Sequence, residues 1–90
     1  MRVLNLEAVT RKSEGSLRLL ATFDLEPSKS LRLYGLRLLE AADGRRIIYA
    51  AQSGARRTAT FDPVTAQQIT KLASTIYDEA ATAHGTYSKN

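Results

Sequence analysis

The chain has 90 residues, no cysteine, one histidine and a formal net charge of +4. This length suffices for one compact domain with one core, and the lack of cysteine excludes disulfides and thiolate metal sites. The N-terminus lacks an uninterrupted apolar segment, and no stretch approaches the roughly 20 apolar residues of a membrane span. We therefore expect one cytoplasmic domain over residues 1–82 that does not associate with a membrane, followed by a flexible polar tail over residues 83–90.

The first half of the chain has the patterns of three strands. Residues 2–11 form the first candidate, residues 17–26 the second and residues 31–40 the third. The apolar positions of the third strand change phase at Gly35, which predicts a β-bulge there. The second strand is the most regular, and one of its faces carries only apolar residues: Leu17, Leu19, Ala21, Phe23 and Leu25.

Two shorter strands follow a hairpin turn at Asp43-Gly44, a dipeptide that favours tight turns. They span residues 45–51 and residues 57–61, and a short polar link joins them. Sequential strands with short connections favour antiparallel pairing. The strand patterns therefore predict a five-stranded, mainly antiparallel sheet.

The C-terminal segment has the signature of an amphipathic helix that begins at Asp62-Pro63 and ends at about Ala81. Aspartate caps free N–H groups, and proline at the first helical position has no N–H to leave unpaired. An amphipathic helix has an apolar stripe along one side. This stripe favours packing on the protein's own sheet, and the alternative is a seam that binds a partner. The fold class is therefore α+β in two layers. The apolar stripe consists of Ala66, Ile69, Ala73, Ile76 and Ala80, broadened by Leu72 and Tyr77.

One helix covers only one face of such a sheet. On the other face, the alternating pattern places four apolar residues among charged neighbours: Leu20, Tyr34, Leu39 and Ile48. A contiguous exposed apolar patch marks an association surface, whereas scattered exposed leucines need no explanation. Together with the small core, these four candidates for a dimer face favour a homodimer.

The positive charge is concentrated in one stretch. Residues 44–71 contain five cations and one acidic residue, and the rest of the chain contains eight of each. A polyanion-binding surface has this asymmetry, although arginines at strand ends also serve solubility. We expect three or four of the arginines to reach one rim of the sheet and contact phosphates, with Tyr49 and Phe61 in the core. The five cations are Arg45, Arg46, Arg56, Arg57 and Lys71.

Arrangements that would support catalysis are not evident. His84, the only histidine, lies in the predicted tail, and the acidic residues are scattered along the chain. Neither Asp43-Gly44 nor Ser53-Gly54 leads into the helix and lysine of a phosphate-binding loop. We therefore expect no enzyme activity, no catalytic residue, no metal site and no cofactor.

The order of these segments resembles the family of stage V sporulation protein G, the small bacterial SpoVG proteins. The similarity covers about residues 1–81 and is clearest in LYGLRLLEAADGRRIIYAAQSGARRTATFDPVTAQQI, residues 33–69. In that family an apolar strand follows a glycine turn and leads into a Ser-containing basic loop, another strand and a Pro-initiated helix. Ser53, Arg56-Arg57 and Pro63 match these later parts.

The resemblance implies a five-stranded antiparallel sheet, a homodimer, and a cytoplasmic regulator that binds DNA or RNA and is linked to sporulation and septation. It places the basic loop at Arg56-Arg57 and, less directly, at Arg45-Arg46. The chain departs from the family in having Ala51-Gln52-Ser53 where proline-serine is usual, and in its shorter basic loop. The alternative is a non-catalytic protein-interaction module that uses the apolar sheet face, with the arginines serving solubility.

Overall fold

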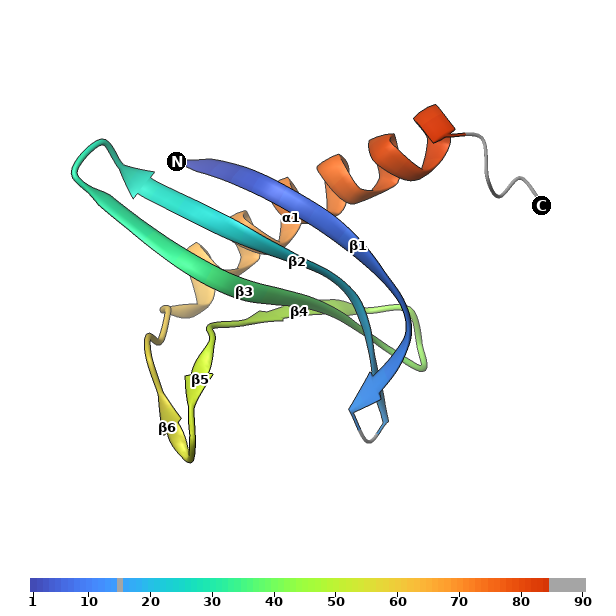
Figure 1. Ribbon diagram of the computed structural model, residues 1–90, viewed down its shortest axis with the longest axis horizontal. Helices are drawn as coiled ribbons and strands as arrows, with labels where there is room; N and C mark the ends of the chain where they lie inside the picture. Colours follow the sequence, from blue (N-terminus) through green and yellow to red (C-terminus); the bar gives the residue numbers. More distant parts are fainter. Residues whose placement is uncertain (15, 85–90) are drawn as a thin grey trace.

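In a computed structural model of the protein, which describes residues 1–14 and 16–84, a curved antiparallel sheet packs on one helix (Figure 1). The sheet has four strands in the order β1-β2-β3-β4, and a separate two-stranded hairpin pairs β5 with β6. The strands are β1 (Arg2–Glu14), β2 (Leu17–Ser28), β3 (Leu31–Ala41), β4 (Arg46–Tyr49), β5 (Gln52–Ser53) and β6 (Arg56–Arg57), and the helix is α1 (Pro63–His84).

The α+β class, the antiparallel pairing and the C-terminal helix are confirmed, but the five-stranded sheet is wrong. The predicted strand over residues 57–61 does not pair with β4. Arg56 and Arg57 pair instead with Ser53 and Gln52. Thr58 then donates from its backbone N–H to the carbonyl of Ala51, so the hydrogen bonds of this segment close a local hairpin and do not extend the sheet.

The predicted bulge at Gly35 is confirmed. Phe23 pairs with Leu36 and Leu25 pairs with Leu33, so β3 has one more residue than β2 between these two pairs. Gly35 has a φ of +73°, in the left-handed region that glycine adopts without steric cost. The bulge keeps the leucines on both sides of it in contact with the core.

A second bulge, in β2, has no glycine to mark it. Leu19 pairs with Leu39 and Ala21 pairs with Leu38, so Leu20 is an extra residue between the two pairs. Leu20 and Ala21 therefore both belong to the main core cluster. The regular alternation predicted from Leu17 onward is interrupted at this position.

The helix begins and packs as predicted. The carboxylate of Asp62 accepts a hydrogen bond from the N–H of Thr65 at 3.4 Å, and α1 continues three residues beyond the predicted end, to His84. Ile69 and Ala73 are fully buried and lie in the main core cluster. The apolar stripe thus packs on the protein's own sheet, with Tyr77 partly buried against the same cluster.

The predicted exposed apolar face is wrong for three of its four residues. Leu20, Leu39 and Ile48 have exposed fractions of 3%, 0% and 8%, whereas Tyr34 is 65% exposed. The β2 bulge turns Leu20 into the core, and Ile48 pairs with Leu38 on the side that packs on the helix. These residues therefore supply no exposed dimer face.

The last predicted segment, the tail over residues 83–90, begins inside α1, and residues 85–90 lie outside the described residues. No described helix is both long enough and apolar enough to span a membrane.

Candidate nucleic-acid interface

The β5–β6 hairpin, residues 52–57, is called the arm here; it extends away from the sheet beyond the end of β4 (Figure 1). Gly54, with a φ of +63°, occupies the first position of its two-residue turn, as a type II′ turn requires. At the base, both the N–H and the hydroxyl of Thr58 donate to the carbonyl of Ala51. A two-stranded hairpin is marginally stable alone, so these bonds help to hold the arm in place.

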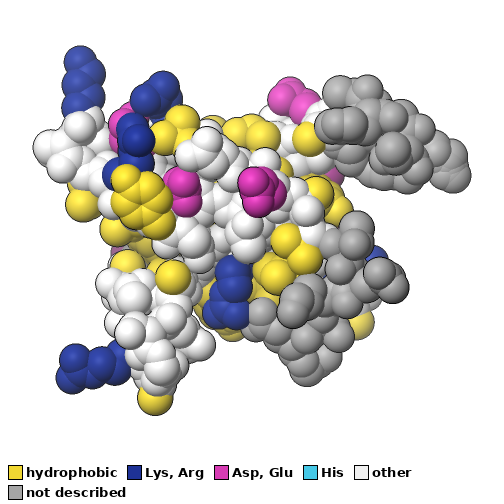
Figure 2. Space-filling model, viewed as in Figure 1, with side chains coloured by type: hydrophobic (Ala, Val, Ile, Leu, Met, Phe, Trp, Pro, Cys, Tyr) yellow, Lys and Arg dark blue, Asp and Glu magenta, His cyan; other side chains and the backbone are white. Residues whose placement is uncertain are grey.

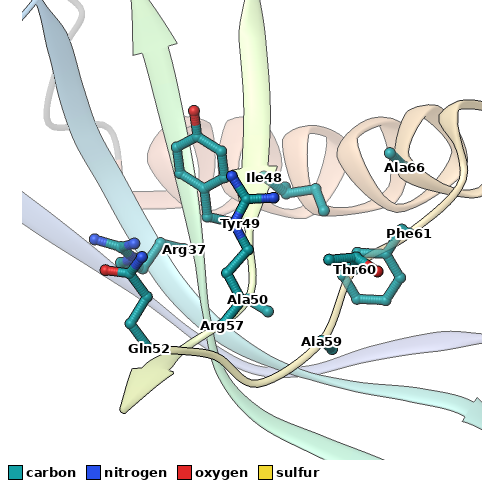
Figure 3. Close-up of a pocket in the computed structure, with 10 residues that line it drawn as sticks. All are labelled: Arg37, Ile48, Tyr49, Ala50, Gln52, Arg57, Ala59, Thr60, Phe61 and Ala66. Atoms are coloured by element: carbon teal, nitrogen blue, oxygen red, sulfur yellow. The ribbon is translucent and has the colours of Figure 1, made fainter. Parts of the chain in front are cut away.

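The arm carries Arg56 and Arg57, which are both exposed. Neither forms an ion pair with a carboxylate in the part of the chain that the structure describes. Side chains of successive strand residues point to opposite faces, and the Arg57 side chain extends back toward Tyr49 (Figure 3). The arm therefore offers two guanidinium groups to an anion without first breaking an internal ion pair.

The other arginine pair lies at the opposite end of β4, beside the β3–β4 turn (Figure 1). Arg45 is exposed and binds the carboxylate of Asp43, with 3.1 Å between Nε and Oδ2. The Asp43 pKa is lowered, chiefly because its carboxylate accepts the backbone N–H of Arg45. The expectation that the two arginine pairs meet at one rim is therefore wrong, because β4 runs between them.

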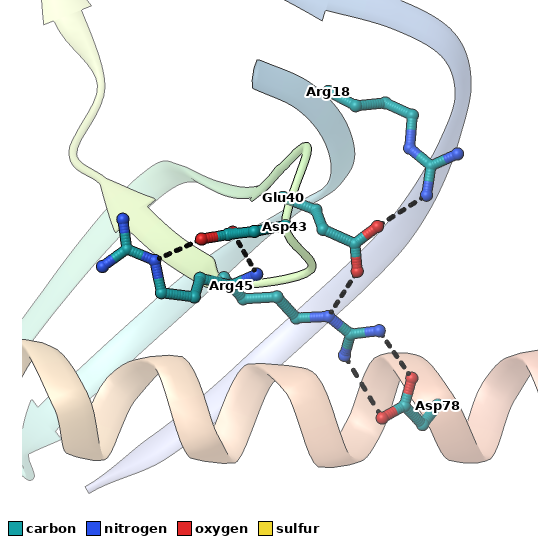
Figure 4. A network of polar contacts seen from close by, with 6 residues as sticks. Arg18, Glu40, Asp43, Arg45 and Asp78 are labelled. Atoms are coloured by element: carbon teal, nitrogen blue, oxygen red, sulfur yellow. Dashed lines mark hydrogen bonds and ion pairs between the residues drawn. The ribbon is translucent and has the colours of Figure 1, made fainter. Parts of the chain in front are cut away.

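Arg46 is committed to internal contacts (Figure 4). Its guanidinium lies 3.2 Å from the Glu40 carboxylate, 3.1 Å from that of Asp78 and 5.3 Å from the centroid of the Tyr77 ring. Burial disfavours its charge, but the hydrogen bonds to Asp78 and then Glu40 outweigh this effect and raise its pKa. Arg46 therefore stabilises the contact between sheet and helix and is a poor candidate for a phosphate contact.

The last predicted cation, Lys71, is exposed on α1, on the side of the helix away from Ile69 and Ala73. Figure 2 shows Lys and Arg side chains at separate places on one face of the molecule, with basic groups at the β2–β3 turn and on the arm. The five predicted cations thus do not form one continuous patch. Arg56 and Arg57 are the pair that the fold keeps together and exposed.

A cavity of about 440 Å³ lies where the arm leaves the sheet (Figure 3). Tyr49, at the end of β4, is 42% exposed and borders this cavity. The guanidinium carbon of Arg37 lies 5.8 Å from the centroid of the Tyr49 ring, within the range of a cation–π contact. The cavity is lined by Arg37, Ile48, Tyr49, Ala50, Gln52, Arg57, Ala59, Thr60, Phe61 and Ala66.

Tyr49 was expected in the core, and that expectation is wrong. Pairing of Leu38 with Ile48 directs Ile48 toward the helix, and Tyr49, opposite Arg37, therefore faces the other way. Arg37 was not predicted as a site residue, because its position beside Tyr49 depends on strand register. Phe61 is partly buried against the core, as expected, and also lines the cavity.

The cavity combines the exposed Arg57, the half-buried Arg37, the exposed ring of Tyr49, an amide and a hydroxyl around one concave surface. Among the described residues, no group of three or more His, Asp or Glu side chains is placed to hold a metal ion. No protein-family model, curated protein or solved structure matches the chain. The residues at the arm and cavity are thus the basis for assigning a function.

Proposed function

We propose that the protein is a cytoplasmic nucleic-acid-binding regulator that is similar to SpoVG proteins, and that the arm contacts phosphates through Arg56 and Arg57. The observation that carries the proposal is the exposure of both arginines on a projecting hairpin, without an ion pair among the described residues. Cations that are free of internal partners release counterions when they bind a nucleic acid, and this release drives association. Arg45 and Lys71 are secondary contacts, because they lie on other elements.

The order of segments in the sequence supports the same proposal. The arm coincides with the basic loop that the SpoVG resemblance places at Arg56-Arg57. The alternative, an interaction module that uses the sheet face, loses its basis because Leu20, Leu39 and Ile48 are buried. A role in sporulation or septation follows only from the resemblance and is part of the proposal.

Fluorescence anisotropy with labelled duplex DNA and single-stranded RNA at several salt concentrations tests the proposal. We expect Arg56→Ala/Arg57→Ala to weaken binding and to reduce the slope of log affinity against log salt by about 0.7–0.9 for each lost phosphate contact. The control is Lys29→Ala, compared with Arg57→Ala alone, because each removes one exposed positive charge and Lys29 lies away from the arm, at the β2–β3 turn. Equal loss in both variants would show a general charge effect and no interface at the arm. Failure of the wild type to bind either polymer at low salt would end the proposal.

We also propose that two copies associate, as the resemblance implies. Within the described residues, β4 is an edge strand, and α1 exposes Val64 and Leu72 to 62% and 37%. An unpaired edge and exposed apolar side chains are features that a second copy would cover. Sedimentation equilibrium should give twice the chain mass of 9.9 kDa. A single 9.9 kDa species at every concentration would exclude the dimer.

A further inference from the structure

We infer that the cavity beside the arm holds one unpaired nucleobase stacked on Tyr49, so that the protein prefers single-stranded nucleic acid to duplex. The inference rests on the proposed function and adds to it the class of polymer. Phosphate contacts alone do not distinguish bases or strandedness, whereas a stacking site requires a base that is free of its partner.

The cavity has the size and composition that such a site needs. Its volume of about 440 Å³ lies within the range of about 300–1,000 Å³ that is usual for small-molecule sites. Ile48, Phe61 and Ala66 contribute apolar surface at one side, where Thr60 also lies, and the other side carries Arg37, Gln52 and Arg57 (Figure 3). One flat base fits such a volume, and a base pair held within a helix does not enter it.

Tyr49 is oriented for stacking. Arg37 lies over its ring, so a base would stack on the opposite face. Arg37 and Tyr49 are cross-strand partners, and their contact fixes the ring direction before a ligand arrives. An aromatic side chain fixed in this way loses little conformational freedom on binding.

The arm supplies positive charge for the phosphate of the stacked nucleotide. Arg57 lines the same cavity as Tyr49 and extends toward it from β6 (Figure 3). A nucleotide whose base stacks on Tyr49 would thus have its phosphate within the reach of this guanidinium, while Arg56, on the other face of the hairpin, is available to a phosphate farther along the strand. One polymer would then engage both the cavity and the arm.

Two neutral polar residues complete the site. The amide of Gln52 and the hydroxyl of Thr60 line the cavity, and each can both donate and accept hydrogen bonds. They can therefore contact the edge of an unpaired base, whose donors and acceptors are not occupied by a complementary base. Neither residue forms a side-chain hydrogen bond with another described residue.

The test compares Tyr49→Ser, Tyr49→Phe and the control Tyr34→Ser, which removes an exposed tyrosine from the β2–β3 end of the sheet. The probes are a single-stranded oligonucleotide containing 2-aminopurine and the matching duplex. We expect Tyr49→Ser to weaken single-strand binding by about tenfold, because stacking of one base is worth a factor of that order. Tyr49→Phe and Tyr34→Ser should stay within about twofold of the wild type. Circular dichroism verifies that each variant is folded.

The salt dependence separates this inference from the proposed function. Stacking releases no counterions, so Tyr49→Ser should keep the wild-type salt slope, while Arg57→Ala should reduce it by about 0.7 on a single strand. Quenching of 2-aminopurine by the wild type and its loss in Tyr49→Ser would support the stacked base. Equal affinity for duplex and single strand, or unchanged binding by Tyr49→Ser, would overturn the stacking site and leave phosphate binding at the arm intact. Absence of binding to both polymers would overturn both.

Discussion

Arg46 of β4 and Asp78 of α1 form a bidentate contact, with 3.1 Å between Nη2 and Oδ1 and 3.2 Å between Nη1 and Oδ2 (Figure 4). The same guanidinium binds Glu40, whose other oxygen accepts from Arg18 at 2.8 Å. A planar guanidinium suits such paired contacts, which fix orientation as well as distance. The network therefore joins the C-terminal half of the helix to β2, β3 and β4.

The first prediction concerns this contact. Asp78→Ala should lower the free energy of unfolding by about 0.5–1 kcal/mol, because the pair is partly exposed and solvent screens it. Arg46→Ala should cost more, about 1.5–3 kcal/mol, because it also leaves Glu40 without one of its two arginines and uncovers Tyr77. Urea unfolding followed by circular dichroism measures both. Glu79→Ala, at the neighbouring exposed position, is the control. Equal effects of Asp78→Ala and Glu79→Ala would contradict a structural role for the pair.

The second prediction concerns Asp24, which contacts a bulge in each strand beside β2. One is the bulge at Gly35 in β3, and the other lies in β1, which has one more residue than β2 between the pairs Leu4–Asp24 and Glu7–Thr22. Its Oδ2 accepts from the side-chain amide of Asn5 at 3.0 Å, and its Oδ1 accepts from the N–H of Gly35 at 3.1 Å. Asn5 has a φ of +55°, which is uncommon for a residue with a side chain. Asp24→Ala should therefore lower the free energy of unfolding by about 1–2 kcal/mol, since it removes a partner from both irregular positions. Asp24→Asn should lose less, because the amide keeps one acceptor oxygen.

Gly35→Ala tests the backbone conformation of the β3 bulge that Asp24 contacts. A Cβ at this position would meet the Cβ of Ala51 at 3.6 Å, an ordinary contact, so the expected loss of about 1–2 kcal/mol comes from the left-handed backbone. Gly44→Ala is the matched comparison, because Gly44 has a φ of +92° and open space around it. Similar losses in the two variants would confirm backbone strain as the cause, and a much larger loss at Gly35 would point to crowding.

Much of the fold could be predicted because local signals marked it. Asp62-Pro63 marked the start of the helix, Gly35 marked a bulge, and the leucines of β3 marked the strand beside it. The bulge at Leu20 left no such signal, because Leu19, Leu20 and Ala21 are all apolar and none is a glycine or proline. The predicted dimer face failed here for Leu20, since the extra residue in β2 lets Leu20 and Ala21 both belong to the core.

The candidate site was harder to predict than the fold. The arginine pairs are visible in the sequence, but whether each guanidinium is free depends on partners that are distant along the chain, as Asp78 is from Arg46. Ile47, Ile48 and Tyr49 are consecutive apolar residues, so no alternation indicates which of them faces the helix. The pairing of Ile48 with Leu38 places Ile48 on the side of the sheet that packs on the helix. The arm contains only two residue pairs, too few to produce a recognisable strand pattern.

The third prediction concerns pH and Glu26, whose carboxylate accepts from Arg32 at 2.9 Å and from Arg2 at 2.8 Å. The hydrogen bond to Arg32, followed by that to Arg2, lowers the Glu26 pKa below its ordinary value of 4.5. The folded protein therefore holds this proton less tightly than the unfolded chain. The resulting stabilisation is fully present above the unfolded pKa and is lost as the pH falls through the lower pKa of the folded state.

Glu26→Gln should consequently lower the urea midpoint at pH 7, and its difference from the wild type should shrink as the pH is reduced below 4.5. Unfolding curves recorded in steps from pH 7 to about pH 3 measure this change. Glu7→Gln is the control, because Glu7 is exposed and forms no ion pair among the described residues. A constant difference between Glu26→Gln and the wild type across this range would show that the contribution of Glu26 does not depend on its charge.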